Sequence, residues 1–121
     1  MTAKAASFKK AERLTNTKEY RVVLRNGAVL RKKWLALYYL PNNNQSQSRL
    51  GIVISRHSLR QASDRNLAKR VIREFFRLHK SKFHINFSVV VRAISNCKVL
   101  SRNELREMLE GLFHEAGILS G

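Results

Sequence analysis

Two short apolar runs, with a long amphipathic segment between them, constrain the fold of this chain most strongly. Residues 50–55 (LGIVIS) and 87–94 (FSVVVRAI) have the length and the β-branched content of buried strands. Asp64 is a plausible N-cap, and apolar residues then recur at helical spacing to about Lys80. The sequence therefore predicts a strand, a helix and a strand in succession, as in a sheet with a helix packed on it.

A short helix is predicted nearer the N-terminus. Asn16 is a suitable N-cap for it, and Gly27 would end it. Its apolar face would carry Tyr20, Val23 and Leu24.

Strand formers and one more helix complete the chain. Residues 28–30 and 34–40 are rich in strand formers, and a polar loop follows them. Ser101 and Glu104 form a capping box for a last helix, which Gly117 ends. The order is helix, two or three strands, helix, strand, helix. We expect an α+β sandwich, a small sheet covered by helices.

Size and composition indicate one domain with a polyanionic partner. The chain has 121 residues, 44% of them hydrophobic, and we expect a single domain over 1–121 with a flexible basic arm at 1–10 and a tail at 117–121. The net charge of +16 indicates nucleic acid or an acidic membrane surface as the partner. No apolar run approaches the roughly 20 residues that span a bilayer, and the N-terminus has no secretory h-region. Cys97, the single cysteine, fits a reducing cytoplasm.

The long amphipathic helix separates charge from apolar side chains. At about 100° per residue, its cations fall within about 140° of arc and its apolar residues on the opposite side, with Phe76 near the boundary. The cationic face comprises Arg65, Asn66, Lys69, Arg70, Arg73, Arg77 and Lys80.

A solvated helix face is the alternative to a nucleic-acid contact. Solvated faces usually mix charges of both signs, whereas Glu74 is the only acid on this helix after Asp64. Because the like charges would repel, we favour phosphate contacts, for which arginine is well suited. Asn66 could read a base or sugar, or cap the helix.

Aromatic side chains offer stacking platforms for single-stranded RNA. On a strand, Trp34 and Tyr38 would share one face and Tyr39 the other. Core packing is the alternative for each ring. We expect Trp34 in the core and Tyr38 or Tyr39 as a platform.

No catalytic motif is found. The chain has no phosphate-binding glycine loop, HExxH, CxxC or Asp-x-Asp pair. Among the histidines, only His57 lies in a basic loop, where a surface cation near phosphate is a better interpretation than an acid–base catalyst. We therefore expect no catalytic residue and no metal ligand in this polypeptide.

The pattern Arg65-Asn66-x-x-Lys69-Arg70-x-x-Arg73 resembles the RNxxKRxxR signature of the bacterial ribonuclease P protein component. The resemblance covers roughly residues 8–116. Its supporting matches are Arg13-Leu14, Glu19-Tyr20, Gly27, the run 50–57, Val89-Val90-Val91-Arg92 and Leu112-Phe113.

The resemblance implies an α-β sandwich of order α-β-β-β-α-β-α, with a four-stranded sheet and a left-handed βαβ crossover. It implies an accessory subunit of a cytoplasmic enzyme whose catalytic RNA subunit, with Mg²⁺ bound mainly by that RNA, removes the 5′ leader of precursor tRNA. The implied partners are the RNA subunit and precursor tRNA, with no membrane and no protein partner required.

The resemblance also implies two sets of binding residues. Those implied to bind the RNA subunit are Arg56, Arg65, Asn66, Lys69, Arg70 and Arg73. Those implied to line a cleft for the leader are Tyr20, Leu24 and Tyr39. Three positions depart from the family pattern: Leu67 for Arg, His57 for Lys and Leu24 for Phe.

Two other functions fit the charge. A small basic ribosomal-type RNA-binding protein would not account for the spacing of the signature. A helix-turn-helix DNA-binding protein would need a partner helix before residue 65, where strands are predicted instead.

Overall fold

The order of elements confirms the predicted order of helices and strands. The computed structural model describes residues 13–14, 17–42 and 47–119. Its elements, in chain order, are α2 (Thr17–Asn26), β1 (Ala28–Lys32), β2 (Leu35–Pro41), β3 (Arg49–Val53), α3 (Ala62–His79), the short 3-10 helix η2 (Lys80–Lys82), β4 (Phe87–Ala93) and α4 (Arg102–Glu115). The expected arm at 1–10 and the N-cap at Asn16 lie outside the described residues, as do the last two residues of the tail.

One mixed sheet forms the middle layer. Its strand order is β1-β2-β4-β3, with β1–β2 and β2–β4 antiparallel and β3–β4 parallel. The parallel pair is joined through α3, as a βαβ unit requires. The left-handedness of this crossover stays a prediction from the resemblance.

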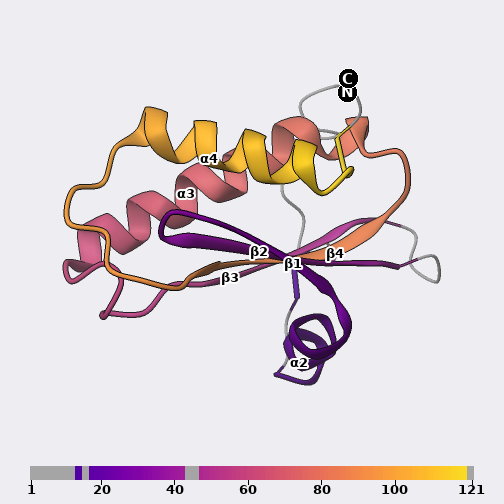
Figure 1. Cartoon of the computed structure of the whole chain (residues 1–121), viewed down its shortest axis with the longest axis horizontal. Coiled ribbons are helices and arrows are strands. Elements are labelled where there is room, and N and C mark those ends of the chain that lie inside the picture. The colour runs from indigo at the N-terminus through magenta and orange to yellow at the C-terminus, as the bar shows by residue number, and fades with distance from the viewer. Residues whose placement is uncertain (1–12, 15–16, 43–46, 120–121) are drawn as a thin grey trace.

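The helices cover both faces of the sheet (Figure 1). Helices α3 and α4 pack on one face, where the main core includes Leu37, Phe76 and Phe113, each at most 1% exposed. Helix α2 crosses the other face over a smaller cluster that contains Val23 and Val90. The α2 face of the sheet is thus only partly covered.

Side-chain contacts fix α2 on the sheet. Arg49 Nη1 lies 2.7 Å from Glu19 Oε1, and Arg49 Nη2 donates to the carbonyl oxygen of Arg13 at 2.7 Å. Tyr20 lies directly against the backbone of Gly51, since a Cβ at that position would be 2.5 Å from Tyr20 Cε1. Glycine is therefore what lets α2 approach this strand so closely.

The ends of α3 differ from the prediction. The helix begins at Ala62 after an N-cap at Gln61, and Asp64 is in its first turn. The reason is that Arg65 N donates to Gln61 O at 3.1 Å, which closes the first turn earlier. In the first turn, the Asp64 carboxylate still interacts favourably with the helix dipole. The α-helix ends at His79, and Lys80 belongs to η2.

The first hairpin is longer than predicted. Arg31 and Lys32, expected between two strands, pair with Ala36 and Leu35 and extend β1. The chain turns at Lys33, whose φ is 54°, in the left-handed region. Strand β3 is Arg49–Val53 and β4 ends at Ala93, so both stop sooner than the apolar runs suggested.

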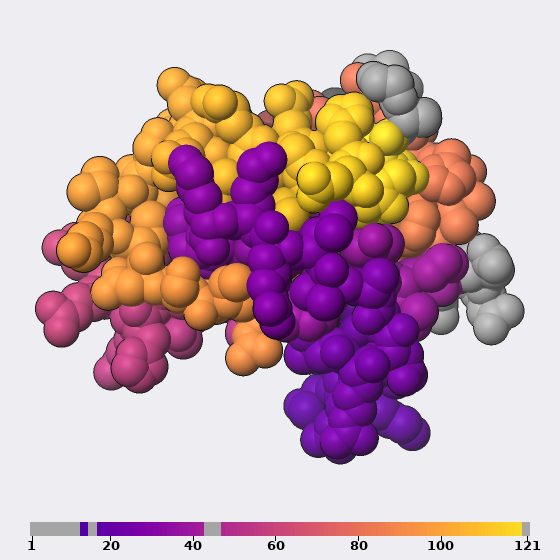
Figure 2. Space-filling view, in the orientation of Figure 1, coloured from indigo at the N-terminus to yellow at the C-terminus, as the bar shows by residue number. Residues whose placement is uncertain are grey.

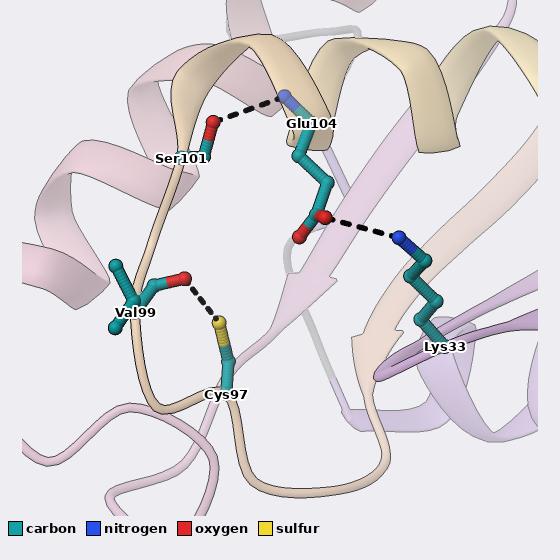
Figure 3. Close-up of polar contacts among 5 residues, drawn as sticks. All are labelled: Lys33, Cys97, Val99, Ser101 and Glu104. Atoms are coloured by element: carbon teal, nitrogen blue, oxygen red, sulfur yellow. Dashed lines mark hydrogen bonds and ion pairs between the residues drawn. The ribbon is translucent and has the colours of Figure 1, made fainter.

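The predicted capping box of α4 is confirmed at its N-cap, Ser101, whereas the Glu104 carboxylate bonds Lys33 (Figure 3). Glu104 N donates to Ser101 Oγ at 3.2 Å, and the Glu104 carboxylate accepts a hydrogen bond from Lys33 Nζ at 3.0 Å. After the helix, Gly117 has a φ of 76°, as its predicted role as the stop requires. In the loop before α4, Cys97 Sγ donates to Val99 O at 3.4 Å.

Within the part of the chain that the structure describes, no helix has the length and apolar character needed to cross a bilayer.

Candidate nucleic-acid interface

The cationic and apolar side chains of α3 lie on opposite faces. Its buried residues are Ala68, Val71, Ile72, Phe75 and Phe76. Asn66, Arg70 and Arg73 are exposed, while Arg65 and Lys69 are half-buried. Phe76, near the boundary on the helical wheel, is buried because the Phe83 ring packs edge-on against it at 5.8 Å.

Two of the α3 cations are held by neighbouring protein groups. Arg65 Nη1 donates to Leu59 O at 2.9 Å and to Arg60 O at 2.8 Å, so its guanidinium also fixes the loop before the helix. Arg77 forms an ion pair with Glu74. The hydrogen bond from Arg77 lowers the pKa of the Glu74 carboxyl and raises that of Arg77.

Three other α3 cations remain available to an anionic partner. Among the described residues, no ion pair involves Lys69, Arg70 or Arg73. Arg56 is exposed on the loop after β3. The cationic residues of the signature therefore share one side of the molecule without being neutralised by described carboxylates.

A small hollow joins this helix face to α2. It has a volume of about 130 Å³ and lies at the β3 edge of the sheet. We name it the edge hollow; it is lined by Arg13, Leu14, Tyr20, Leu50, Ile52, Lys69 and Arg73. Two predicted RNA-binding cations and one predicted cleft residue thus border one hollow.

A larger groove lies on the α2 face of the sheet. It has a volume of about 720 Å³, and we name it the sheet groove; its lining residues are Arg31, Tyr38, Ser55, His57, Ser58, Arg92, Ala93, Ile94, Ser95 and Asn96. Arg31 is paired with Ala36 and Ala36 with Arg92, so the two arginines share one row across the sheet. Residues in such a row point to the same face.

The structure separates Tyr39 from the other two predicted cleft residues, Tyr20 and Leu24. Tyr39 packs in the main core and meets the Phe87 ring edge-on at 6.4 Å, on the face covered by α3 and α4. Tyr38 instead packs with Tyr20 and Leu24 on the α2 face. Since consecutive strand residues point to opposite faces, Tyr38 and Tyr39 had to lie on different faces of the sheet.

Trp34 is in the core, as predicted, with 6% of its surface exposed. It belongs to the main core cluster, so the expectation that it shares a face with Tyr38 is wrong. The physical reason is the turn at Lys33: Trp34 precedes the first residue of β2 and is not part of the strand alternation.

Sequence reasoning missed Arg31 and Arg92. The signal for Arg92 was present, because this residue is the single cation in an otherwise apolar strand, two positions after Val90. Because side chains alternate between the two faces of a strand, Arg92 lies on the same face as Val90, the α2 face. Arg31 could be recognised as a residue of the sheet groove only once the pairing register of the hairpin was known.

Two of the other histidines pack against aromatic rings. His79 stacks on Phe75 with ring centres 4.1 Å apart, and His84 lies edge-on to Phe87 at 5.6 Å. The described residues include no cluster of three or more histidine, cysteine or acidic side chains that could hold a metal ion.

Comparisons with known proteins agree on one family. The family model for ribonuclease P matches residues 8–117. The ribonuclease P protein component of Buchnera aphidicola is 36% identical over 107 residues, covering 88% of this chain and 91% of that protein. That of Shouchella clausii is 30% identical over 113 residues, covering 93% and 92%.

Solved structures share the fold. The ribonuclease P protein of Staphylococcus aureus superposes with a TM-score of 0.83 at 27% identity, covering 92% of this chain and all of that one. The Thermotoga maritima protein gives 0.69 at 27% identity, covering 91% and 99%. The chain therefore belongs to the family of bacterial ribonuclease P protein components, the protein part of a tRNA-processing ribozyme complex.

Proposed function

We propose that this chain binds the catalytic RNA subunit through α3 and holds the 5′ leader of precursor tRNA in the sheet groove. The observation that carries the proposal is the edge hollow. Lys69 and Arg73 of α3 and Tyr20 of α2 border it together, so a surface for folded RNA adjoins a surface for a single strand.

The RNA-subunit contact rests on the charge of the α3 face. Phosphate contacts by lysine and arginine release counterions and dominate RNA affinity. The residues proposed for this contact are Arg56, Arg65, Asn66, Lys69, Arg70 and Arg73. Arg65 is fixed by two backbone carbonyls, so part of its guanidinium is oriented before RNA binds.

The leader contact rests on the chemistry of the sheet groove. Arg31 and Arg92 supply phosphate contacts on its floor, and Tyr38 supplies a ring on which a base can stack. Tyr20 and Leu24 pack against the same small cluster as Tyr38, so they would continue this surface onto α2. His57 also lines the groove, where it can donate a hydrogen bond to RNA.

Catalysis is proposed to belong to the RNA subunit. The donor groups of the described residues do not fit a Mg²⁺ site, so the chain is not proposed to hold the ion. Its cations would offset the repulsion between crowded phosphates, which should lower the Mg²⁺ concentration that the RNA subunit needs.

The test is a reconstituted cleavage assay at low Mg²⁺ with a bacterial ribonuclease P RNA. The wild-type chain should stimulate leader removal. Stimulation should fall in Arg70→Gln, through weaker RNA-subunit binding. In Arg92→Gln, weaker binding of leader-carrying precursor is expected, with mature tRNA binding unchanged.

Arg106→Gln is the matched control, because Arg106 is an exposed α4 arginine outside both surfaces. Equal losses in Arg106→Gln and in the other two variants would contradict the assignment of separate surfaces. RNA binding without any stimulation of cleavage would favour the ribosomal-type alternative.

A further inference from the structure

Helix α2 carries a second cationic face that neither proposed surface includes. Lys18, Arg21 and Arg25 are exposed, and at about 100° per residue they fall within about 60° of arc. We name these three residues the α2 ridge. Val22, beside them, is 43% exposed.

No described carboxylate neutralises the α2 ridge. Glu19 is the only acid on α2, and its carboxylate is paired with Arg49 of β3. No ion pair among the described residues involves Lys18, Arg21 or Arg25. Repulsion between like charges three and four residues apart weakens a helix by a few tenths of a kcal/mol per pair, so an unneutralised ridge is a cost that an anionic ligand would remove.

The position of α2 places one residue of the ridge, Arg21, on the side of the helix toward the sheet groove. The helix crosses the strands, with Tyr20 on Gly51 of β3 at one edge and Gly27 against the Tyr39 backbone near the other. Glu19 faces Arg49, at the end of β3 away from the groove. Arg21 is about 200° further round the helix than Glu19, so it lies on the side of α2 toward the groove, with Arg25 and Lys18 next to it on the outward side.

Helices α2 and α3 lie on opposite sides of the sheet (Figure 1). A folded RNA docked on the α3 face would meet α2 first at the edge hollow, which Tyr20 lines together with Lys69 and Arg73. A flexible strand that lies in the sheet groove needs only to continue past Arg21. The space-filling view shows α2 as a protrusion below the rest of the molecule, open to such a strand (Figure 2).

We propose that the α2 ridge binds phosphates of the leader where this single strand leaves the sheet groove. This inference rests on the proposed function, since it requires the leader to occupy the groove. It adds a contact that depends on leader length: a short leader would fill the groove only, and a long one would also reach the ridge.

The test uses the triple variant Lys18→Gln/Arg21→Gln/Arg25→Gln in the reconstituted complex. Affinity is measured against salt for precursors with short and with long leaders. For long leaders, the magnitude of the slope of log affinity against log salt should fall by about 2, because each of the three lost single-strand contacts contributes roughly 0.7. For short leaders the slope should match that of the wild type.

A control with the same charge change is available on the other side of the molecule. Lys98→Gln/Arg102→Gln/Arg106→Gln removes exposed cations from α4 and the loop before it. Equal slopes for the two triple variants, or an equal loss for short and long leaders in the α2 variant, would overturn the inference. Cleavage stimulation by the wild-type chain at low Mg²⁺ reports separately on the proposed function, and circular dichroism checks that each variant is folded.

Discussion

Two glycine-to-alanine substitutions in this chain should affect the free energy of unfolding differently. Gly51→Ala should lower it because Tyr20 packs against the Gly51 backbone, whereas Gly111→Ala should not. In Gly51→Ala, the new Cβ would lie 2.5 Å from Tyr20 Cε1, 2.8 Å from Tyr20 Cζ and 3.0 Å from Leu14 Cδ1. A ring packed on a strand cannot yield without moving α2. We expect Gly51→Ala to lower the free energy of unfolding by about 1–3 kcal/mol, the usual cost of overpacking.

Gly111→Ala is the matched control. There the new Cβ would meet Lys32 Nζ at 2.6 Å, and this atom is the end of a flexible, exposed side chain. Alanine also has a higher helix propensity than glycine, by about 1 kcal/mol. We expect Gly111→Ala to be neutral or to stabilise α4 by up to about 1 kcal/mol.

Urea unfolding followed by circular dichroism measures both changes. We also expect Gly51→Ala to cost less in a Tyr20→Ala background, because the clashing ring is then absent, and this comparison tests the predicted clash. A neutral Gly51→Ala, or a cost that is unchanged in that background, would refute it. In the reconstituted complex, Gly51→Ala should weaken leader binding more than RNA-subunit binding.

The other predictions concern single side chains. Lys69→Ala should reduce the salt slope of RNA-subunit binding by about one phosphate contact, measured by filter binding; an unchanged slope would remove Lys69 from the interface. Ser101→Ala removes the hydrogen bond from Glu104 N and should lower the free energy of unfolding by about 1 kcal/mol. Ser101→Asp should retain most of this stabilisation, because a carboxylate can also accept that hydrogen bond. Burial raises the pKa of the Cys97 thiol, so less thiolate is present at neutral pH than for an exposed cysteine. Alkylation of Cys97 should thus be slower in the folded protein than in urea at the same pH. The difference in rate should shrink as the pH rises above the pKa of the thiol in the folded protein. Equal rates at neutral pH would contradict the prediction.

The sequence contains the information for the order of elements because helix and strand periodicities are local. The separation of charge on α3 follows from the 3.6-residue repeat alone, and the structure confirms it. The capping box at Ser101 was equally visible, since it needs only neighbouring residues.

What could not be predicted depends on contacts between distant segments. Tyr38 and Tyr39 are equivalent in sequence, and only the covering of one sheet face by α3 and α4 decides which tyrosine is in the main core. The row formed by Arg31 and Arg92 depends on a hairpin register set by the turn at Lys33. Such features require the assembled sheet.

The contacts of Arg49 with Glu19 and with the Arg13 carbonyl have a consequence for the thermodynamics of binding. They hold the beginning of α2 to β3, while Gly27 holds its end against β2. With the helix anchored twice, its position relative to the sheet groove is set before any ligand arrives. An incoming strand would therefore lose its own conformational freedom but would not have to order its receptor, and affinity gained by such preorganisation needs no additional contacts.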